Sequence, residues 1–485
     1  MKRVYIIALL LIAGFSLRVY DLTDLPLDFH PTRQLLSLIK ARGMYYATLS
    51  SIPEEQREIA INQWHSKTTF EPELLERLVV FTYRYTGEQV WIARIYSSLF
   101  WMIGGIFLYR LARDLVSENG AILSLTFYLF LPYGVFASRS FQPDPLMLML
   151  TLAFWWTVQR WSRHPISWRF AILSGLFGGL AIFIKFVAAF FVIGAGVGAL
   201  LLNGEKIRTM VHRPQVWVMT VLGILPGAYW LIYGLYITDF LNTKFEGRFI
   251  PALLISPAFY LSWMSMLNIV IGGGLIALAL LGLFFHRQRI FIISLWMAYF
   301  IYGIFFDYHI STHDYYSLMI IPIAALSLAP FADLILPQTS SRLSKIFLLF
   351  FFCFGVFATA WDIRSQLKET DYRPEAAVWT EIGQTLGPRA KITALTQDYG
   401  ARLEYWGWEK ATIWPLYGDL VYHVGLKGAN KGFETLFANL ADRSDFFLVT
   451  MPEELSRQPE LKERLAQYPV FAEGEGYIIY DLKSP

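Results

Sequence analysis

The sequence predicts a mainly α-helical protein that crosses a membrane many times and ends in a small α/β domain. Three observations carry this prediction. The 485 residues are 55% hydrophobic and only 16% charged, a composition typical of polytopic membrane proteins. Apolar segments of membrane-spanning length recur as far as Trp361. Beyond that residue the charged fraction rises and the apolar runs shorten to the length of strands.

Eleven apolar segments have the length and composition of membrane spans. The first follows Lys2 and Arg3, and we interpret it as a retained span rather than a cleaved signal peptide, because no clear cleavage site follows it. The segments are residues 4–20, 91–109, 120–137, 144–160, 169–184, 186–202, 216–236, 261–285, 290–306, 315–334 and 345–361.

Lysine and arginine are distributed unevenly among the connecting segments, and this asymmetry predicts the orientation. With the N-terminus in the cytoplasm, the inner ends carry Lys2, Arg3, Arg110, Arg113, Arg160, Arg163, Arg169, Lys206, Arg208, Arg213, Arg287, Arg289, Arg342 and Lys345. The short outer connections carry only Arg139, Lys185, Lys244 and Arg248. Residues 170–202 must then form two helices, with Lys185 at the tip of an outward-facing hairpin. Everything after Trp361 lies outside, as do the segments 21–90, 138–143, 237–260 and 307–314.

The predicted domains are a membrane domain, residues 1–361, and an extracytoplasmic α/β domain, residues 362–485. The second alternates strands with helices, as small α/β domains do. Strands are expected at 391–396, 411–416, 446–451 and 477–482, and helices at 374–386, 400–406, 432–440 and 452–468. Gly425, Gly428 and Gly432 do not follow a strand as a phosphate loop would, so no nucleotide site is expected there.

The first outer loop, residues 21–90, contains two distinctive stretches. Residues 71–85 place Leu74, Leu78, Phe81 and Tyr85 on one helical face, which is typical of a helix lying in the membrane interface.

The other stretch, residues 25–43, gathers polar residues directly after the first span. Prolines oppose a helix in its first half, so Asp28 and His30 are expected on a loop, and Thr32 is expected to cap the helix that follows. The stretch either carries chemistry at the membrane surface or anchors helix ends as a snorkelling amphipathic segment, and the residues leave both open.

Further polar residues are predicted to lie at the same outer surface of the membrane. Asp144 begins the fourth span, where it would complement the helix dipole or serve a site. Lys185 is either a charge placed at a hairpin turn or a cation for a lipid phosphate, and we favour the second. Arg139 is either a helix-end anchor or a second phosphate ligand.

His309 and His313 stand four residues apart beside a tyrosine pair. This spacing suggests a divalent metal such as zinc, but no HExxH motif is present. Tyr315 and Tyr316 are typical of aromatic residues at a membrane interface. The single cysteine, Cys353, excludes a disulfide framework, and a net charge of +3 does not favour nucleic acid as a partner.

Together these features resemble the GT-C class of membrane glycosyltransferases. The likeness is to bacterial members of family 39, which includes protein O-mannosyltransferases and the aminoarabinose transferase of lipid A. It rests on LPxxFHPTRQ-like text at 25–34, PDPL at 143–146, Lys185 at the end of the fifth span, HDYY at 313–316 and a soluble outer domain that closes the chain.

The resemblance implies an enzyme, a glycosyltransferase of the cell envelope that resides in the bacterial inner membrane. It would move a sugar, with inversion, from a polyprenyl-phosphate donor to a lipid, glycan or protein acceptor on the outer face. A carboxylate of the first outer loop would accept the proton of the acceptor, and cations would hold the departing phosphate. Many relatives carry an Asp-Glu pair after HP, where this chain has Thr32 and Arg33. The first candidate for the base is therefore Asp28, then Asp24, with Asp144 positioning the acceptor or the base.

The same resemblance gives the remaining site candidates. Those for the lipid phosphate and the donor are Lys185, Arg139, Arg33, His30, Tyr315 and Tyr316. His313 and His309 are the candidates for a divalent metal, and no other cofactor is implied.

Two other functions remain open. A transporter or flippase for polyprenyl lipids or sugars would need polar residues through the middle of the membrane, whereas the charges here lie at span ends. A non-catalytic membrane scaffold with an outer interaction domain would be distinguished by failing to bind polyprenyl phosphate.

Overall fold

The computed structural model describes residues 2–67, 71–202, 207–238, 249–338, 341–421 and 432–483. Lys206, Lys244, Arg248, Gly425 and Gly428, which enter the sequence-based predictions, lie outside these residues.

The chain forms two compact units. Unit 1 comprises Met1–Thr23, Thr68–Val79 and Trp91–Thr370, and unit 2 comprises Asp24–Lys67, Val80–Val90 and Asp371–Pro485. The predicted domains placed the whole first outer loop with the membrane helices. The structure instead groups most of that loop with the C-terminal residues, because its helices pack against the α/β fold.

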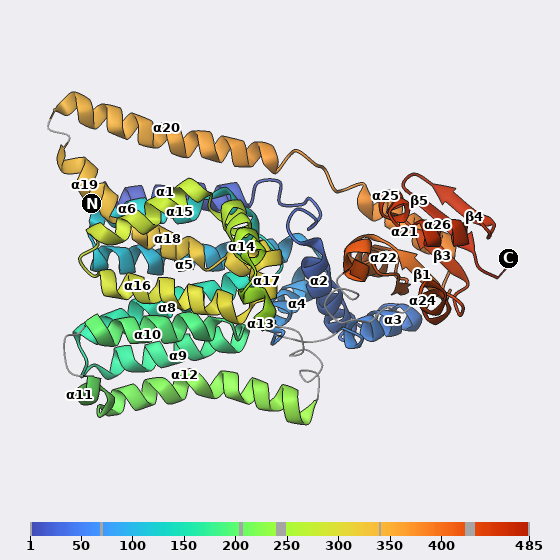
Figure 1. Ribbon diagram of the computed structural model, residues 1–485, viewed down its shortest axis with the longest axis horizontal. Helices are drawn as coiled ribbons and strands as arrows, with labels where there is room; N and C mark the ends of the chain where they lie inside the picture. Colours follow the sequence, from blue (N-terminus) through green and yellow to red (C-terminus); the bar gives the residue numbers. More distant parts are fainter. Residues whose placement is uncertain are drawn as a thin grey trace. The chain divides into compact units, whose positions relative to one another are not determined.

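Unit 1 is a bundle of apolar helices (Figure 1). Each of the eleven predicted spans coincides with a helix or with consecutive helices, so the polytopic helical fold is confirmed. Within the described residues the helices are α1 (Lys2–Arg18), α5 (Trp91–Leu115), α6 (Glu118–Phe130), α7 (Pro132–Ser138), α8 (Asp144–Arg163), α9 (Trp168–Ile184), α10 (Ala188–Leu202), α11 (Ile207–Val211), α12 (Pro214–Ile232), η1 (Tyr233–Ile237), α13 (Pro251–Leu254), α14 (Pro257–Val270), α15 (Gly273–Gly282), η3 (Leu283–Phe285), α16 (Arg289–Phe305), α17 (Asp307–Thr312), η4 (Asp314–Ser317), α18 (Ile320–Leu328), α19 (Pro330–Gln338) and α20 (Arg342–Gln366).

Two of the predicted spans are bent. α6 and α7 meet at 64°, where Pro132 ends the first helix and begins the second. α14 and α15 meet at 90°, and Gly272 has φ +94° at the break, a conformation that residues with a Cβ rarely adopt.

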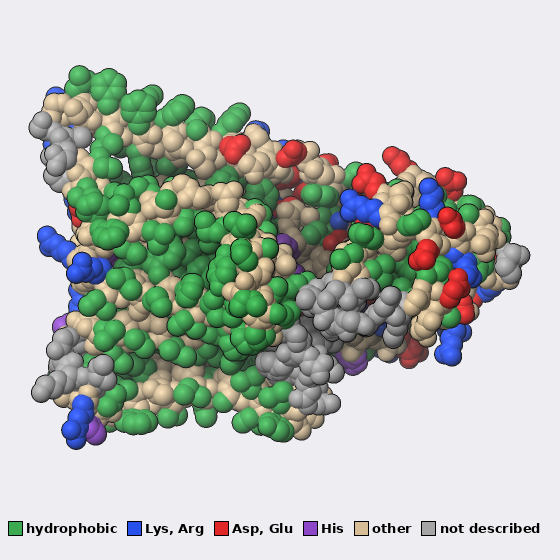
Figure 2. Space-filling model, viewed as in Figure 1, with side chains coloured by type: hydrophobic (Ala, Val, Ile, Leu, Met, Phe, Trp, Pro, Cys, Tyr) green, Lys and Arg blue, Asp and Glu red, His purple; other side chains and the backbone are tan. Residues whose placement is uncertain are grey.

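By length and composition, three described helices could cross a membrane: α5, α12 with η1, and α20. The number rises to five if each bent pair is one span. α9, α10, α16 and the stretch Ile320–Leu336 are shorter apolar helices. Hydrophobic side chains cover most of the visible surface of unit 1, and lysine and arginine gather at the end of the bundle where α11 lies (Figure 2). This distribution agrees with the predicted Lys/Arg asymmetry.

Helix α4 (Leu74–Thr86) begins in unit 1 and ends in unit 2. It forms where a helix was predicted, and Leu74, Phe81 and Tyr85 are exposed on one side of it. A helix with this exposed apolar stripe has the character of an interfacial helix.

Unit 2 is built on a sheet of five described strands in the order β2-β1-β3-β5-β4. β1 is parallel to β2 and β3, whereas β5 is antiparallel to β3 and β4. The elements are α2 (Pro31–Tyr46), α3 (Glu54–His65), α21 (Glu375–Leu386), β1 (Ile392–Leu395), η5 (Gln397–Gly400), α22 (Ala401–Trp406), β2 (Ala411–Ile413), α24 (Phe433–Leu440), β3 (Phe446–Val449), α25 (Pro452–Ser456), α26 (Pro459–Leu465), β4 (Val470–Gly474) and β5 (Tyr477–Asp481).

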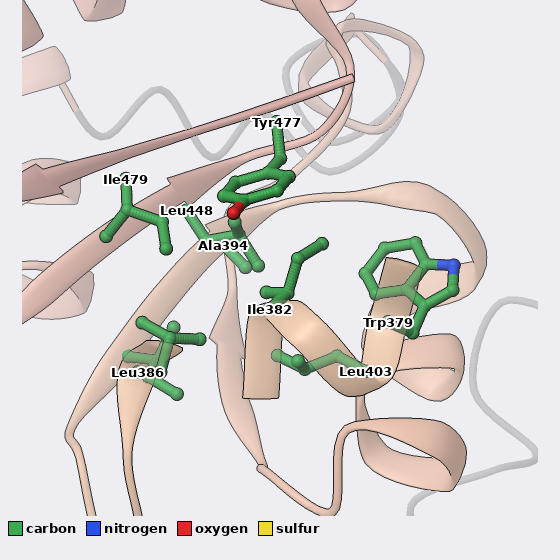
Figure 3. Close-up of a cluster of buried hydrophobic side chains, with 9 residues drawn as sticks. Trp379, Ile382, Leu386, Ala394, Leu403, Leu448, Tyr477 and Ile479 are labelled. Atoms are coloured by element: carbon green, nitrogen blue, oxygen red, sulfur yellow. The ribbon is translucent and has the colours of Figure 1, made fainter. Parts of the chain in front are cut away.

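Both faces of this sheet are covered by helices. On one face, Trp379 and Ile382 of α21 pack against Ala394 and Leu448 of the sheet (Figure 3). On the other face, Trp414 packs in a cluster with residues of β1, β3, α24 and α26, including Leu395, Phe437, Phe447 and Leu465. The predicted α/β domain is therefore confirmed.

Three local predictions for unit 2 need correction. Strand β4 and helix α3 were not expected, since their sequences are mixed in polarity. The single helix predicted at 452–468 is two helices, because Pro459 cannot continue the first and begins the second. Thr32 does not cap α2. His30 takes the cap position with φ 45°, and the Thr32 hydroxyl donates to Asp398 instead.

Arg42 of α2 is buried where α2 meets α22. Its Nε donates to Glu88 Oε1 at 2.9 Å, and its guanidinium lies over the rings of Tyr405, at 3.7 Å, and Trp408, at 4.4 Å. Burial alone lowers the pKa of Arg42, but Tyr405 and Glu88 outweigh it and hold the pKa above its usual value. Arg42 is therefore charged and anchors the outer-loop helices to the α/β fold.

We expect Arg42→Ala to destabilise unit 2 by about 3–5 kcal/mol, because Glu88 would lose its buried counter-ion. Arg42→Lys should recover only part of this loss, since an ammonium cannot stack between two rings as a planar guanidinium does. Thermal melting of the purified variants measures the effect, and a native melting temperature for Arg42→Ala would contradict it.

Candidate active site

The end of α9 and the start of α8 hold a buried ion pair in unit 1. α9 ends at Ile184 and α10 begins at Ala188, which confirms the predicted hairpin, and Lys185 lies between them in an extended conformation. Lys185 Nζ lies 2.8 Å from Asp144 Oδ1, with side-chain exposures of 11% and 7%. Asp144 is also the first residue of α8, where the helix dipole stabilises its negative charge.

Two adjoining tyrosine rings lie beside the lysine of this ion pair. Lys185 Nζ lies 5.7 Å from the ring centre of Tyr315 and 5.9 Å from that of Tyr316, within the range of cation–π attraction. Tyr316 in turn lies 5.0 Å, ring centre to ring centre, from His309. The structure therefore brings together in unit 1 six of the predicted residues: Asp144, Lys185, Tyr315, Tyr316, His309 and His313.

His309 and His313 face each other with ring centres 5.7 Å apart. His309 is on α17, whereas His313 follows the end of that helix, and its Nδ1 lies 2.8 Å from Thr312 Oγ1. Among the described residues no group of three or more His, Cys, Asp or Glu could hold a metal. Two imidazoles fall short of the three protein ligands of a catalytic zinc, so the metal site stays a prediction without structural support.

Arg139 has a different environment within unit 1. It is buried, and its Nη2 donates to the carbonyl of Asp21 at 3.0 Å. Arg94 Nη1 lies 3.4 Å from the carbonyls of Asp21 and Leu22. Both guanidiniums thus fix the chain just after the first span. Arg94 was not singled out from the sequence, although an arginine within the apolar segment 91–109 was a usable signal.

In unit 2, the carboxylate of Asp24 binds backbone N–H groups. Its carboxylate is buried, and Oδ1 accepts hydrogen bonds from the backbone N–H groups of Leu25 and Tyr372, each at 2.9 Å. Asp24 therefore ties the first outer loop to the segment that leads into α21.

Asp28, His30 and Arg33 are half-buried in the same unit. The loop that carries Asp28 is fixed by the start of α2, since the Gln34 side chain donates to the carbonyl of Phe29 at 2.7 Å. The carbonyl of His30 accepts from the N–H of Arg33 at 3.0 Å. Asp28 and His30 lie outside helices, as predicted, and both residues are only half-buried.

These geometries suit two complementary tasks. The group in unit 1 places a desolvated cation among aromatic rings at the ends of apolar helices, where an anionic lipid head group would be attracted. The group in unit 2 carries a carboxylate on a fixed loop, which suits proton transfer.

The arrangement of helices and the C-terminal sheet is a GT-C-type fold, as the comparisons with solved structures establish. ArnT from Cupriavidus metallidurans bound to undecaprenyl phosphate matches with a TM-score of 0.62 and 16% identity, over 98% of this chain and 97% of that one. Its apo form matches with a TM-score of 0.61, 17% identity and the same coverage. The archaeal oligosaccharyltransferase AglB from Archaeoglobus fulgidus, in complex with an inhibitory peptide and a dolichol-phosphate, matches with a TM-score of 0.56 and 10% identity, over 97% of this chain and 72% of that one.

Sequence comparison matches a smaller part of the chain. The family described as dolichyl-phosphate-mannose-protein mannosyltransferase matches residues 76–233, about a third of the chain. Comparison with curated proteins found no match. The fold expected from the sequence resemblance is therefore confirmed.

Proposed function

We propose that this chain is a membrane glycosyltransferase that transfers a sugar from a polyprenyl-phosphate donor to an acceptor on the outer face of a bacterial inner membrane. Its N-terminus lies in the cytoplasm and unit 2 lies outside. The fold shared with ArnT bound to undecaprenyl phosphate and with AglB bound to a dolichol-phosphate supports a polyprenyl-phosphate ligand.

The observation that carries this proposal is the Lys185–Asp144 ion pair, whose ammonium lies beside the adjoining rings of Tyr315 and Tyr316. A polyprenyl phosphate has an apolar tail and one anionic head, so its site needs a cation at the end of apolar helices. A nearly buried ammonium interacts with a phosphate more strongly than an exposed one, because water screens it less. Asp144 holds Lys185 in place, and Lys185 stabilises the phosphate as it leaves.

The general base is Asp28. It takes the proton of the acceptor hydroxyl while that oxygen attacks the anomeric carbon, and the bond to the phosphate breaks on the opposite face. One displacement of this kind inverts the anomeric configuration. Asp24 is less suited, since its carboxylate already accepts two backbone hydrogen bonds.

A transfer assay tests the function. The protein is reconstituted in lipid vesicles with a radiolabelled undecaprenyl-phosphate sugar and an extract of envelope glycolipids. We expect label to move to the extract with release of undecaprenyl phosphate, at rates that depend on Lys185. Movement of the intact labelled lipid across the bilayer without cleavage would establish a flippase instead.

A further inference from the structure

The sheet of unit 2 has a topological switch point between β1 and β3. From β1 the chain passes to β2 on one side, and from β2 it returns to β3 on the other side of β1. In open α/β sheets, ligands bind outside the carboxyl ends of the strands at such a point.

Hydroxyl and amide side chains meet at this position. Thr396 follows β1 and Thr450 follows β3, and the hydroxyl oxygens of these two residues are hydrogen-bonded at 2.9 Å. The Gln397 side-chain amide donates to the carbonyl of Thr450 at 3.0 Å and its oxygen accepts from the Thr450 hydroxyl. These bonds fix the two strand ends to each other. Thr396 and Thr450 are buried there, and Gln397 is half-buried at the edge of the sheet.

The backbone that follows is strained. Asp398, Tyr399 and Gly400 have φ of 51°, 50° and 78°; glycine adopts this region freely and aspartate occasionally, whereas the side chain of Tyr399 disfavours it. Strain of this kind persists only where the surroundings impose it, and it clusters at ligand-binding sites.

Asp398 imposes this conformation through two contacts. Its Oδ1 accepts from the Thr32 hydroxyl at 3.0 Å, and its Oδ2 pairs with Arg402 Nε at 2.5 Å. Arg402 is held in turn by Glu375, at 2.7 Å. The loop is thus shaped before any ligand arrives, and it is joined to the segment that carries Asp28, four residues before Thr32.

Tyr399 lies on the strained loop and is exposed to solvent. Its side chain is 53% exposed, and its hydroxyl lies 3.4 Å from Asp419 Oδ1. An exposed aromatic ring beside carboxylate and amide groups has the chemistry that binds a sugar, whose ring has an apolar face and a rim of hydroxyls. A phosphorylated ligand is disfavoured, since the carboxylate of Asp398 stands where nucleotide sites have a glycine-rich turn.

We propose that Gln397, Asp398 and Tyr399 form a saccharide-binding subsite that recognises a glycan portion of the acceptor. Identification of this saccharide as the acceptor rests on the proposed glycosyltransferase function, whereas saccharide binding itself does not. Tyr399 stacks on the sugar ring, and the polar groups of the loop bind its hydroxyls.

The test uses the full-length protein in lipid nanodiscs and saturation-transfer NMR with methyl glycosides of glucose, galactose, mannose and N-acetylglucosamine. We expect at least one glycoside to bind, and Tyr399→Ala and Tyr399→Leu to weaken that binding at least fivefold. Tyr399→Phe should bind within twofold of the native protein, because the ring remains. The matched control is Phe471→Ala, which removes a ring of similar exposure, 49%, from edge strand β4 and should change nothing.

Binding that is absent from the native protein, or equal in Tyr399→Ala and Phe471→Ala, would overturn the proposal. Undecaprenyl phosphate binding and sugar transfer, measured on the same preparations, separate the two hypotheses. If both are absent while Tyr399-dependent saccharide binding persists, the glycosyltransferase function fails and the subsite stands.

Discussion

Asp28→Asn is expected to lower the rate of sugar transfer by about 10²- to 10⁴-fold, the range that general-base catalysis contributes. Asparagine has nearly the same shape but cannot accept the proton of the acceptor. The folded structure should persist, because Asp28 is half-buried on a loop fixed by backbone hydrogen bonds of its neighbours. Single-turnover transfer, thermal melting and undecaprenyl phosphate binding together measure these effects.

The matched control is Asp24→Asn in the same loop. Its side-chain oxygen can still accept from the N–H groups of Leu25 and Tyr372, so transfer should stay within a few-fold of the native rate. Asp24→Ala loses both bonds and should destabilise the fold by about 1–3 kcal/mol. Loss of transfer in Asp24→Asn, with full activity in Asp28→Asn, would assign the base to Asp24 instead.

Lys185→Ala is expected to weaken binding of undecaprenyl phosphate by about 10- to 100-fold, which corresponds to roughly 1.4–2.7 kcal/mol. The variant should also be less stable by about 3–5 kcal/mol, since Asp144 keeps its charge and loses the buried ammonium. Lipid titration by native mass spectrometry and thermal melting measure the two effects.

A double variant separates these effects. Lys185→Met combined with Asp144→Asn removes both charges at similar volume, so stability should recover while lipid binding stays weak. If lipid binding also recovered, Lys185 would be a structural charge at a hairpin and not a phosphate ligand.

The sequence predicted the large elements because their signals are strong and local. Segment length and the Lys/Arg asymmetry gave the helices of unit 1, including the break at Lys185 between α9 and α10. Alternation of short apolar runs with helical patterns gave four of the five strands in the described part of unit 2. These signals depend on composition within a window of residues, which is why they needed no tertiary information.

The side-chain contacts that the sequence could not predict involve residues far apart along the chain. Thr32 looked like a helix cap, but its hydroxyl binds Asp398, 366 residues later. Arg42 belongs to the stretch 25–43, for which a snorkelling amphipathic segment was one interpretation, yet Glu88, Tyr405 and Trp408 surround its guanidinium. The strained pair Asp398 and Tyr399 has no sequence signature, because neither residue type requires a positive φ.

The candidate site was predicted in part. Proximity of Asp144, Lys185 and the HDYY stretch followed from a topology that places helix ends at one level, and the structure brings them together within unit 1. The buried role of Asp24 did not follow, since nothing near it in the sequence indicates that it binds the backbone of Tyr372. The sequence therefore identified candidate site residues by their chemical type, but it did not identify the residues that they contact.

An intact-lipid mass spectrum of the purified native protein tests the polyprenyl-phosphate function most directly. We predict a co-purified polyprenyl phosphate or polyprenyl phospho-sugar in the native protein, and its depletion in Lys185→Ala prepared in parallel. If both proteins carry only bulk membrane phospholipids, also after incubation with undecaprenyl phosphate, the proposed donor site is contradicted.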